Sequence, residues 1–225
     1  MDNADRFAIP GKKGDFLYYS GTGGQLNYES EYVVVDVETT GFSPWQGDRI
    51  VELGAVRVTS DGHIVDSIST LINPEIPTTG ARHIHGISID MVQAAPTYKE
   101  VFDQFAQLLD GAVFVAHHAK FDEGFISAES YRAGVKLNRM PGLCTYWLTR
   151  QVLQLPNYKL ATVTNHFGID QELAHSAYDD AFVVAQFLPK LLASYGPIEQ
   201  YIEVTTQPRI GLSGQLLPRN KFLEI

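Results

Sequence analysis

The sequence predicts a mixed α/β fold, in which a central β-sheet is flanked by helices. Two observations lead to this expectation: three apolar strand patterns come first as a meander, and helical patterns then alternate with a further strand. Such an order is typical of sheets whose faces are covered by helices. The 225 residues, 44% of them hydrophobic and 19% charged, suit one medium domain with extensions, or at most two small domains.

Four strands are expected. Tyr32–Val37 is a short β-branched run, which is typical of a buried strand. Ile50–Thr59 follows as a second strand, Ser60–His63 as a hairpin turn, and Ile64–Ile72 as a third strand. Ala112–Ala116 is a further short apolar run and is expected to be buried in the same sheet.

Helices are expected where capping residues precede apolar residues at helical spacing. Ser88 and Thr97 are N-cap candidates, and Gly134 is placed to end a helix. Pro189 should kink the last helix or start a new one. The expected helices are Ser88–Gln93, Tyr98–Leu109, Phe121–Ala133, Cys144–Leu153, Leu160–Phe167 and a core helix from about Tyr178.

The two ends of the chain carry no clear periodicity. Residues 1–29 are interpreted as an N-terminal extension, residues 30–195 as the globular domain, and residues 196–225 as a C-terminal helix or tail that could bind a partner. The glycine-rich segment Gly21–Gly24 is interpreted as a plain turn, because no strand precedes it and it lacks the lysine of a P-loop.

Composition excludes several classes of protein. No apolar run approaches the roughly 20 residues needed to span a bilayer, and the N-terminus does not resemble a secretory signal. The single cysteine, Cys144, excludes an internal disulfide, so we expect a cytoplasmic protein without a membrane partner. The net charge of −9 argues against a nonspecific nucleic-acid coat, but not against an enzyme that meets phosphate through metal ions.

Four carboxylates and one histidine are the candidate site residues. Asp36 and Glu38 end the first strand and project from the same face, because strand residues i and i+2 do so. Paired carboxylates repel each other unless a cation, commonly a divalent metal, lies between them. Asp122 and Asp180 begin helices, where each alone is readily explained as a favourable first-turn residue. His175, on the loop before Asp180, is suited to accept a proton from water.

Three segments resemble the motifs of the DnaQ-like DEDDh 3′–5′ exonucleases. This family includes the proofreading epsilon subunit of bacterial DNA polymerase III, ribonuclease T, oligoribonuclease and the TREX enzymes. The segments are VVVDVETTGFSPWQGDRIVELGAV, FVAHHAKFDEGFI and HSAYDDAFVVAQFL, and HIHGIS with the following PTYKEVFDQF resembles the family's connecting region. The resemblance covers about residues 31–193 and implies an RNase H-like fold and a DEDDh exonuclease domain at residues 30–195.

The resemblance also implies a two-metal mechanism. Asp36, Glu38, Asp122 and Asp180 would organise two Mg²⁺ or Mn²⁺ ions, with Asp36 bridging both. Glu38 and Asp180 would help to hold the ion that carries the attacking water, and Asp122 would act directly or through water. His175 would be the general base for in-line attack on the terminal phosphodiester.

Four more residues are expected near the 3′ nucleotide of the substrate. Thr39 and Thr40 follow the Asp-x-Glu motif directly and are placed to position that nucleotide. An interpretation as strand-end turn formers is equally open for both. His85 and Phe121 are further candidates for the same pocket.

Two positions depart from the family pattern. Many relatives have Asn in place of His118, and many have an Asp-Thr-Leu segment where this chain has Cys144-Thr145-Tyr146. Neither position belongs to the catalytic five, so we expect activity to be kept and substrate handling to differ.

The expected substrate is a single-stranded nucleic-acid 3′ end, with DNA favoured, as in proofreading or repair. One alternative is an RNA-trimming exoribonuclease, because the motifs do not report on the 2′-hydroxyl. Another is an exonuclease-fold subunit that acts mainly by docking on a DNA polymerase. Homodimerisation is a third possibility for the assembly.

Overall fold

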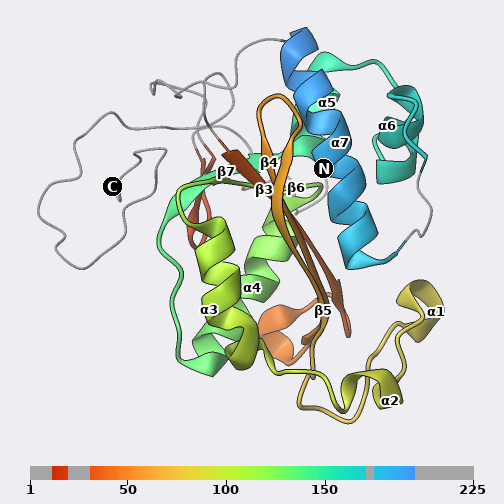
Figure 1. The fold of residues 1–225 in the computed structure, drawn as a ribbon. Helices are drawn as coiled ribbons and strands as arrows, with labels where there is room; N and C mark the ends of the chain where they lie inside the picture. The colour runs from red at the N-terminus through yellow and green to blue at the C-terminus, as the bar shows by residue number, and fades with distance from the viewer. Residues whose placement is uncertain (1–11, 20–30, 171–174, 196–225) are drawn as a thin grey trace, which may run out of the picture.

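The computed structural model describes residues 12–19, 31–170 and 175–195 and folds them around one seven-stranded sheet (Figure 1). Across the sheet the strand order is β1-β2-β7-β6-β3-β4-β5. In chain order the strands are β1 (Lys12–Lys13), β2 (Leu17–Tyr19), β3 (Glu31–Thr39), β4 (Ile50–Thr59), β5 (Ile64–Leu71), β6 (Val113–Ala116) and β7 (Met140–Cys144). The helices are the 3₁₀ turn η2 (Pro44–Gln46), α1 (Arg82–His85), α2 (Ile89–Val92), α3 (Tyr98–Leu109), α4 (Ala119–Ala133), α5 (Thr145–Val152), α6 (Leu160–His166) and α7 (Ala177–Tyr195).

Helices cover both faces of the sheet, which confirms the predicted α/β class. Strands β3, β4 and β5 form the expected antiparallel meander, whereas β6 pairs parallel with β3 and β7 parallel with β6. Helices α3 and α4 lie on one side of the sheet and α7 on the other, with α5 and α6 (Figure 1). None of the helices in the described segments is long and apolar enough to cross a bilayer.

Strand β3 lies between β4 and β6 and is buried on both faces. Val33, Val35 and Val37 pack on the side of α3 and α4, while Tyr32 and Val34 pack on the side of α7. Side chains alternate along a strand, so Asp36 continues the row that faces α7. The end of β3 that bears Asp36 and Glu38 therefore lies next to the start of α7.

Three strands were not predicted. β7 contains Pro141 and Gly142, which normally argue against an interior strand. β2 pairs parallel with β7, and both Phe16 and Leu17 donate their backbone N–H groups to Glu123 Oε1 at 2.8 Å. The sheet therefore begins earlier in the chain than the boundary expected at residue 30. Gly21–Gly24 and residues 196–225 lie outside the described residues.

Most helix ends follow the capping signals in the sequence. α3 has the predicted bounds, and Glu100 Oε2 accepts hydrogen bonds from the backbone N–H of Thr97 at 2.7 Å and from its hydroxyl at 2.8 Å. α4 begins two residues before the expected Phe121 and ends at Gly134. Pro189 lies inside α7, which runs as one helix (Figure 1). The short helix α1 was not predicted.

Candidate active site

The close approach of α7 to the sheet brings the distant acids together. Gly54 on β4 lies opposite Asp36 on β3 in the antiparallel register. A Cβ atom at Gly54 would lie 2.2 Å from the carbonyl carbon of Ala177, the first residue of α7. Only glycine leaves room for this contact. Asp180, one turn into α7, therefore lies over the end of β3.

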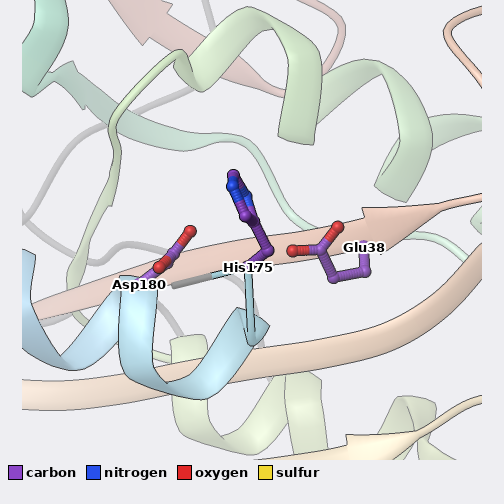
Figure 2. Close-up of side chains that lie close together, drawn as sticks. All are labelled: Glu38, His175 and Asp180. Carbon is purple, nitrogen blue, oxygen red and sulfur yellow. The ribbon is translucent and has the colours of Figure 1, made fainter. Parts of the chain in front are cut away.

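Glu38, His175 and Asp180 form the centre of the site. Each offers one ligand atom, a carboxylate oxygen or an imidazole nitrogen, and these three atoms lie within 4.8 Å of one another. Figure 2 shows the carboxylates of Glu38 and Asp180 pointing toward each other, with the His175 ring beside the gap between them. The three side chains come from a strand end, a loop and a helix.

Asp36 and Asp122 extend this cluster into the protein. Asp122, at the start of α4, is only 3% exposed, and the backbone N–H of Val37 hydrogen bonds to its carboxylate. Burial raises the pKa of Asp36 well above its usual value, and the nearby charges of Asp122, Asp180 and Glu38 raise it further. The four predicted acids therefore lie within one electrostatic cluster.

The repulsion within this cluster favours a cation. Burial, followed by the charge of Asp180, raises the pKa of Glu38 to about 8. Burial also raises the pKa of Asp122 to about 7, against the hydrogen bond from Val37 that lowers it. Protons offset this repulsion in the metal-free protein, and a divalent cation can replace them. Carboxylate oxygens are the ligands that Mg²⁺ and Mn²⁺ prefer, so the donor set fits these ions.

His175 stands at the solvent side of the cluster. Its side chain is exposed, and its backbone has a φ of 67°, in the left-handed region that non-glycine residues rarely adopt. Such a conformation costs about 1–3 kcal/mol and is found preferentially at functional sites. The loop conformation places the imidazole beside the carboxylates of Asp180 and Glu38 (Figure 2).

Thr39 and Thr40 shape the turn after β3. Thr39 Oγ1 donates to the carbonyl oxygen of Gly41 at 2.7 Å. Thr40 Oγ1 accepts the backbone N–H of Arg49 at 2.9 Å and lies 3.3 Å from Asp48 Oδ1. Both hydroxyls thus have partners within the turn, as the turn-former interpretation expects.

His85 lies near the site but is held by its own loop. Its Nδ1 accepts the backbone N–H of Ile87 at 3.0 Å, so its Nε2 carries the proton and donates to the carbonyl oxygen of Thr79 at 3.2 Å. Burial lowers the pKa of His85, and the charge of His175 lowers it further, which places the two rings within electrostatic range. The hydrogen bonds of both ring nitrogens thus hold the His85 ring within its own loop.

Phe121 belongs to an aromatic group at the start of α4. Its ring centroid lies 4.9 Å from that of Phe125 and 6.4 Å from that of Phe42. Phe42, which was not predicted as a site residue, is 80% exposed and follows Thr40 by two positions. Its place after the Asp-x-Glu motif is the sequence signal that could have identified it.

The two departures from the family pattern are in contact with each other. The rings of His118 and Tyr146 have centroids 4.0 Å apart and an interplanar angle of 30°. Cys144 is buried at the end of β7, and the hydroxyl of Thr145 hydrogen bonds to His117 Nδ1 at 2.9 Å. Burial lowers the pKa of His117 to about 4, so this neighbour of His118 stays neutral.

Glu52 is a site residue that the sequence reasoning missed. It lies opposite Glu38 in the β3–β4 register, and its Oε2 accepts the backbone N–H of Ala177 at 3.0 Å. A carboxylate at the start of a helix pairs with an N–H group that has no partner inside the helix. Glu52 therefore fixes the first turn of α7, the turn that places Asp180. The sequence carries no local signal for this role, because the partner of Glu52 lies 125 residues away.

Glu52→Ala should lower kcat strongly and the stability of the fold only modestly. Loss of a helix cap costs about 0.5–2 kcal/mol of stability, whereas a displacement of about 1 Å at a catalytic group can cost about 10²-fold in rate. Glu52→Gln retains an acceptor for the N–H of Ala177 and should retain most of the rate. The measurements are kcat and the thermal unfolding midpoint of each variant.

The matched control is Glu100→Ala, which removes a cap at the start of α3, where it meets Thr97 rather than α7. It should lower the unfolding midpoint comparably and leave kcat unchanged. Equal kcat losses in Glu52→Ala and Glu100→Ala would refute a positioning role for Glu52.

Comparison with known proteins places this geometry in a family. The model of the Exonuclease family RNase_T matches residues 33–188. The chain is 39% identical over 168 residues to DNA polymerase III PolC-type of Clostridium perfringens, and 37% identical over 167 residues to the 3′-5′ exonuclease DinG of Bacillus subtilis. These matches cover 74% and 73% of this chain. The chain spans only 11% of the first relative's length and 18% of the second's.

Solved structures show the same fold. The nuclease domain of 3′hExo, a DEDDh family member bound to rAMP, superposes with a TM-score of 0.63 at 20% identity, over 80% of this chain and 98% of that one. Exonuclease X in complex with 5′ overhanging duplex DNA gives a TM-score of 0.57 at 24% identity, over 72% of this chain and 92% of that one. The predicted RNase H-like fold is confirmed. The chain belongs to the exonuclease family, within the DnaQ-like DEDDh group that its motifs resemble.

Proposed function

We propose that this protein is a metal-dependent 3′–5′ exonuclease that hydrolyses terminal phosphodiester bonds and releases nucleoside monophosphates. The observation that carries the proposal is the cluster of Glu38, His175 and Asp180 within 4.8 Å, with Asp36 and Asp122 in electrostatic contact with it. Membership of the exonuclease family supports the reaction class.

Asp36, Glu38, Asp122 and Asp180 would hold two Mg²⁺ or Mn²⁺ ions. When bound, such ions supply a water of lowered pKa and a positive charge next to the leaving 3′ oxygen. Asp122 is buried, whereas Asp36, Glu38 and Asp180 are partly exposed and would be open to incoming ions. His175 would take the proton from the attacking water and pass it to solvent.

The 3′ nucleotide would lie between the turn after β3 and the start of α4. The backbone of Thr39 and Thr40 would form one wall of this site, and His85 would contribute its imidazole to another. The exposed ring of Phe42, which packs on Phe121, can stack on the terminal base.

DNA is the proposed substrate. The relatives with 37–39% identity are the DNA polymerase III PolC-type and DinG proteins, and their names point to DNA metabolism. RNA trimming is the alternative, because the histone mRNA 3′-exonuclease shares the fold at 18% identity. We also propose a cytoplasmic location and an association with a DNA polymerase or a second copy of the chain. Light scattering distinguishes the monomer from the dimer.

We also propose a division of the chain into one domain and two terminal extensions. Residues 30–195 would be the exonuclease domain, with an N-terminal extension at 1–29 and a C-terminal helix or tail at 196–225. Residues 12–19 of that extension contribute two strands to the sheet of the domain.

Digestion of matched oligomers tests the proposal. The purified protein should shorten 5′-labelled DNA one nucleotide at a time from the 3′ end, with Mg²⁺ or Mn²⁺ and not with EDTA. The RNA oligomer of the same sequence should be cut more slowly, and oligomers with a blocked 3′ end should stay intact. Internal cleavage of the blocked oligomers, or no product from either nucleic acid, would overturn it.

A further inference from the structure

Two aromatic pairs stand on the surface of the protein beside the candidate active site. Phe42 is 80% exposed, Trp45 58% and Tyr131 78%, which are high values for large hydrophobic side chains. Phe42 packs on Phe121 with ring centroids 6.4 Å apart, and Trp45 packs edge-on against Tyr131 at 5.8 Å. We call these four residues the aromatic strip.

The strip follows the axis of α4. Phe121 and Tyr131 are ten residues apart, which corresponds to about 15 Å along a helix. Between them, Gly124 and Ala128 occupy the same side of α4 and leave room for the 3₁₀ turn η2. A Cβ atom at Gly124 would lie 3.6 Å from Pro44 Cγ, so η2 packs directly on this part of the helix.

Hydrogen bonds and ion pairs fix the loop that carries Phe42 and Trp45. Arg132 on α4 donates to the carbonyl oxygens of Pro44 and Asp48. Asp48 Oδ2 in turn accepts the backbone N–H of Ser43 at 2.8 Å. The backbone that carries the two rings is thus fixed before any ligand binds, which reduces the ordering cost of binding.

We propose that the aromatic strip binds the 3′ end of a single-stranded substrate, with Phe42 and Phe121 at the terminal nucleotide and Trp45 and Tyr131 at the nucleotides that precede it. Phe121, at one end of the strip, directly precedes Asp122 at the start of α4, so the strip begins beside the acidic cluster. At a spacing of about 3.4 Å per stacked nucleotide, its length of about 15 Å matches roughly four nucleotides. Aromatic rings stack on every base, so this contact would be independent of sequence. The proposal rests on the proposed exonuclease function.

Stacking, rather than charge, would supply most of this contact. Arg49 Nε pairs with Glu129 Oε1 at 2.7 Å, and Arg132 Nη1 lies 3.3 Å from the same oxygen. Both arginines are thus paired with a carboxylate, and the whole chain carries a net charge of −9. Binding along the strip should therefore depend only weakly on salt concentration, because few phosphates would be neutralised.

The test compares substrates of different length. The p-nitrophenyl ester of thymidine 5′-monophosphate has no upstream nucleotide, whereas oligothymidylates of two to ten residues extend along the strip. For the wild-type protein, KM should fall with length up to about four upstream nucleotides and then level off. Trp45→Ala and Tyr131→Ala should each raise KM for the longest oligomer about fivefold or more, with kcat and the ester kinetics unchanged.

In the double variant Trp45→Ala/Tyr131→Ala, KM should no longer fall with oligomer length beyond the first nucleotides. Phe in place of Ala at position 45 (Trp45→Phe) should restore part of this fall, because it keeps an aromatic ring. Val65→Ala is the control, since Val65 is 46% exposed on the edge strand β5 and should not affect KM. If KM of the double variant fell with oligomer length as in the wild-type protein, the proposal would be overturned, and a protein partner would become the better explanation of the strip. Failure of the exonuclease assignment would instead appear as no cleavage of any substrate by the wild-type protein.

Discussion

Asp36→Asn should abolish nucleotide release while making the metal-free protein more stable. An uncharged amide is a poorer ligand for a divalent cation than a carboxylate, and the loss of metal stabilisation, worth several kcal/mol, should lower the rate by at least about 10³-fold. In the absence of metal, the charge of Asp36 is opposed by burial and by Asp122, Asp180 and Glu38. Removal of that charge relieves the repulsion and should raise the unfolding midpoint in EDTA.

The opposite signs of these two effects separate a metal-binding role from a folding defect. A variant that is inactive because it misfolds would melt at a lower temperature. Asp103→Asn, on the exposed face of α3, is the matched control and should change neither quantity. Undiminished activity of Asp36→Asn would refute the metal-site assignment.

His175→Ala should lower kcat by about 10²- to 10⁴-fold, the usual contribution of a positioned general base. The wild-type rate should rise with pH as an imidazole loses its proton and then level off, because only the neutral ring can accept a proton from water. In the variant this rise should disappear. The measurement is kcat over the range from about pH 5 to about pH 8, at saturating Mg²⁺.

His175 is exposed, so replacing its side chain should cost little stability. Whether the replacement also relieves the strain of the left-handed backbone depends on the new residue. His175→Gly should remove the base and the backbone strain together, and should be as inactive as His175→Ala but more stable. His63→Ala, in the β4–β5 turn, is the control histidine variant. If His175→Ala kept the wild-type pH profile, another group would be the base.

The sequence predicted those strands and helices whose signals lie within the element itself or at its caps. β3 followed from a β-branched apolar run, and α3 from the Thr97 cap with its partner Glu100. β7 was missed because Pro141 and Gly142 are tolerated there only through its neighbours β6 and β2, which are distant in sequence. The strands at residues 12–19 were missed for the same reason: β2 is held by Glu123, more than 100 residues later.

The site was predictable to a similar extent. The two-residue spacing of Asp36 and Glu38 placed both on one strand face. Asp122 and Asp180 are each explained locally as first-turn helix residues, and they joined the pair through their places at helix starts and through the resemblance to a family. The contribution of Glu52 depends on the backbone of Ala177, 125 residues away, so no local pattern could reveal it. Thr39 and Thr40 remained ambiguous because their hydroxyl partners belong to the conformation of the turn.

The most direct test of the convergence of the acids is thermal unfolding as a function of pH, with and without Mg²⁺. The folded-state pKa of Glu38 rises from 4.5 to about 8 and that of Asp122 from 3.8 to about 7, so the folded protein binds more protons than the unfolded chain between these values. In EDTA, the free energy of unfolding should therefore fall as the pH rises from about 4 to about 8. Mg²⁺ binds the deprotonated site and should counteract this loss.

The difference between the unfolding midpoints in Mg²⁺ and in EDTA should thus widen as the pH rises and should shrink in Asp36→Asn. In a domain of this size, each kcal/mol gained corresponds to about 2–4 °C. A wild-type midpoint that is the same with Mg²⁺ and with EDTA at about pH 8 would contradict the account, because the clustered acids would then not share a cation.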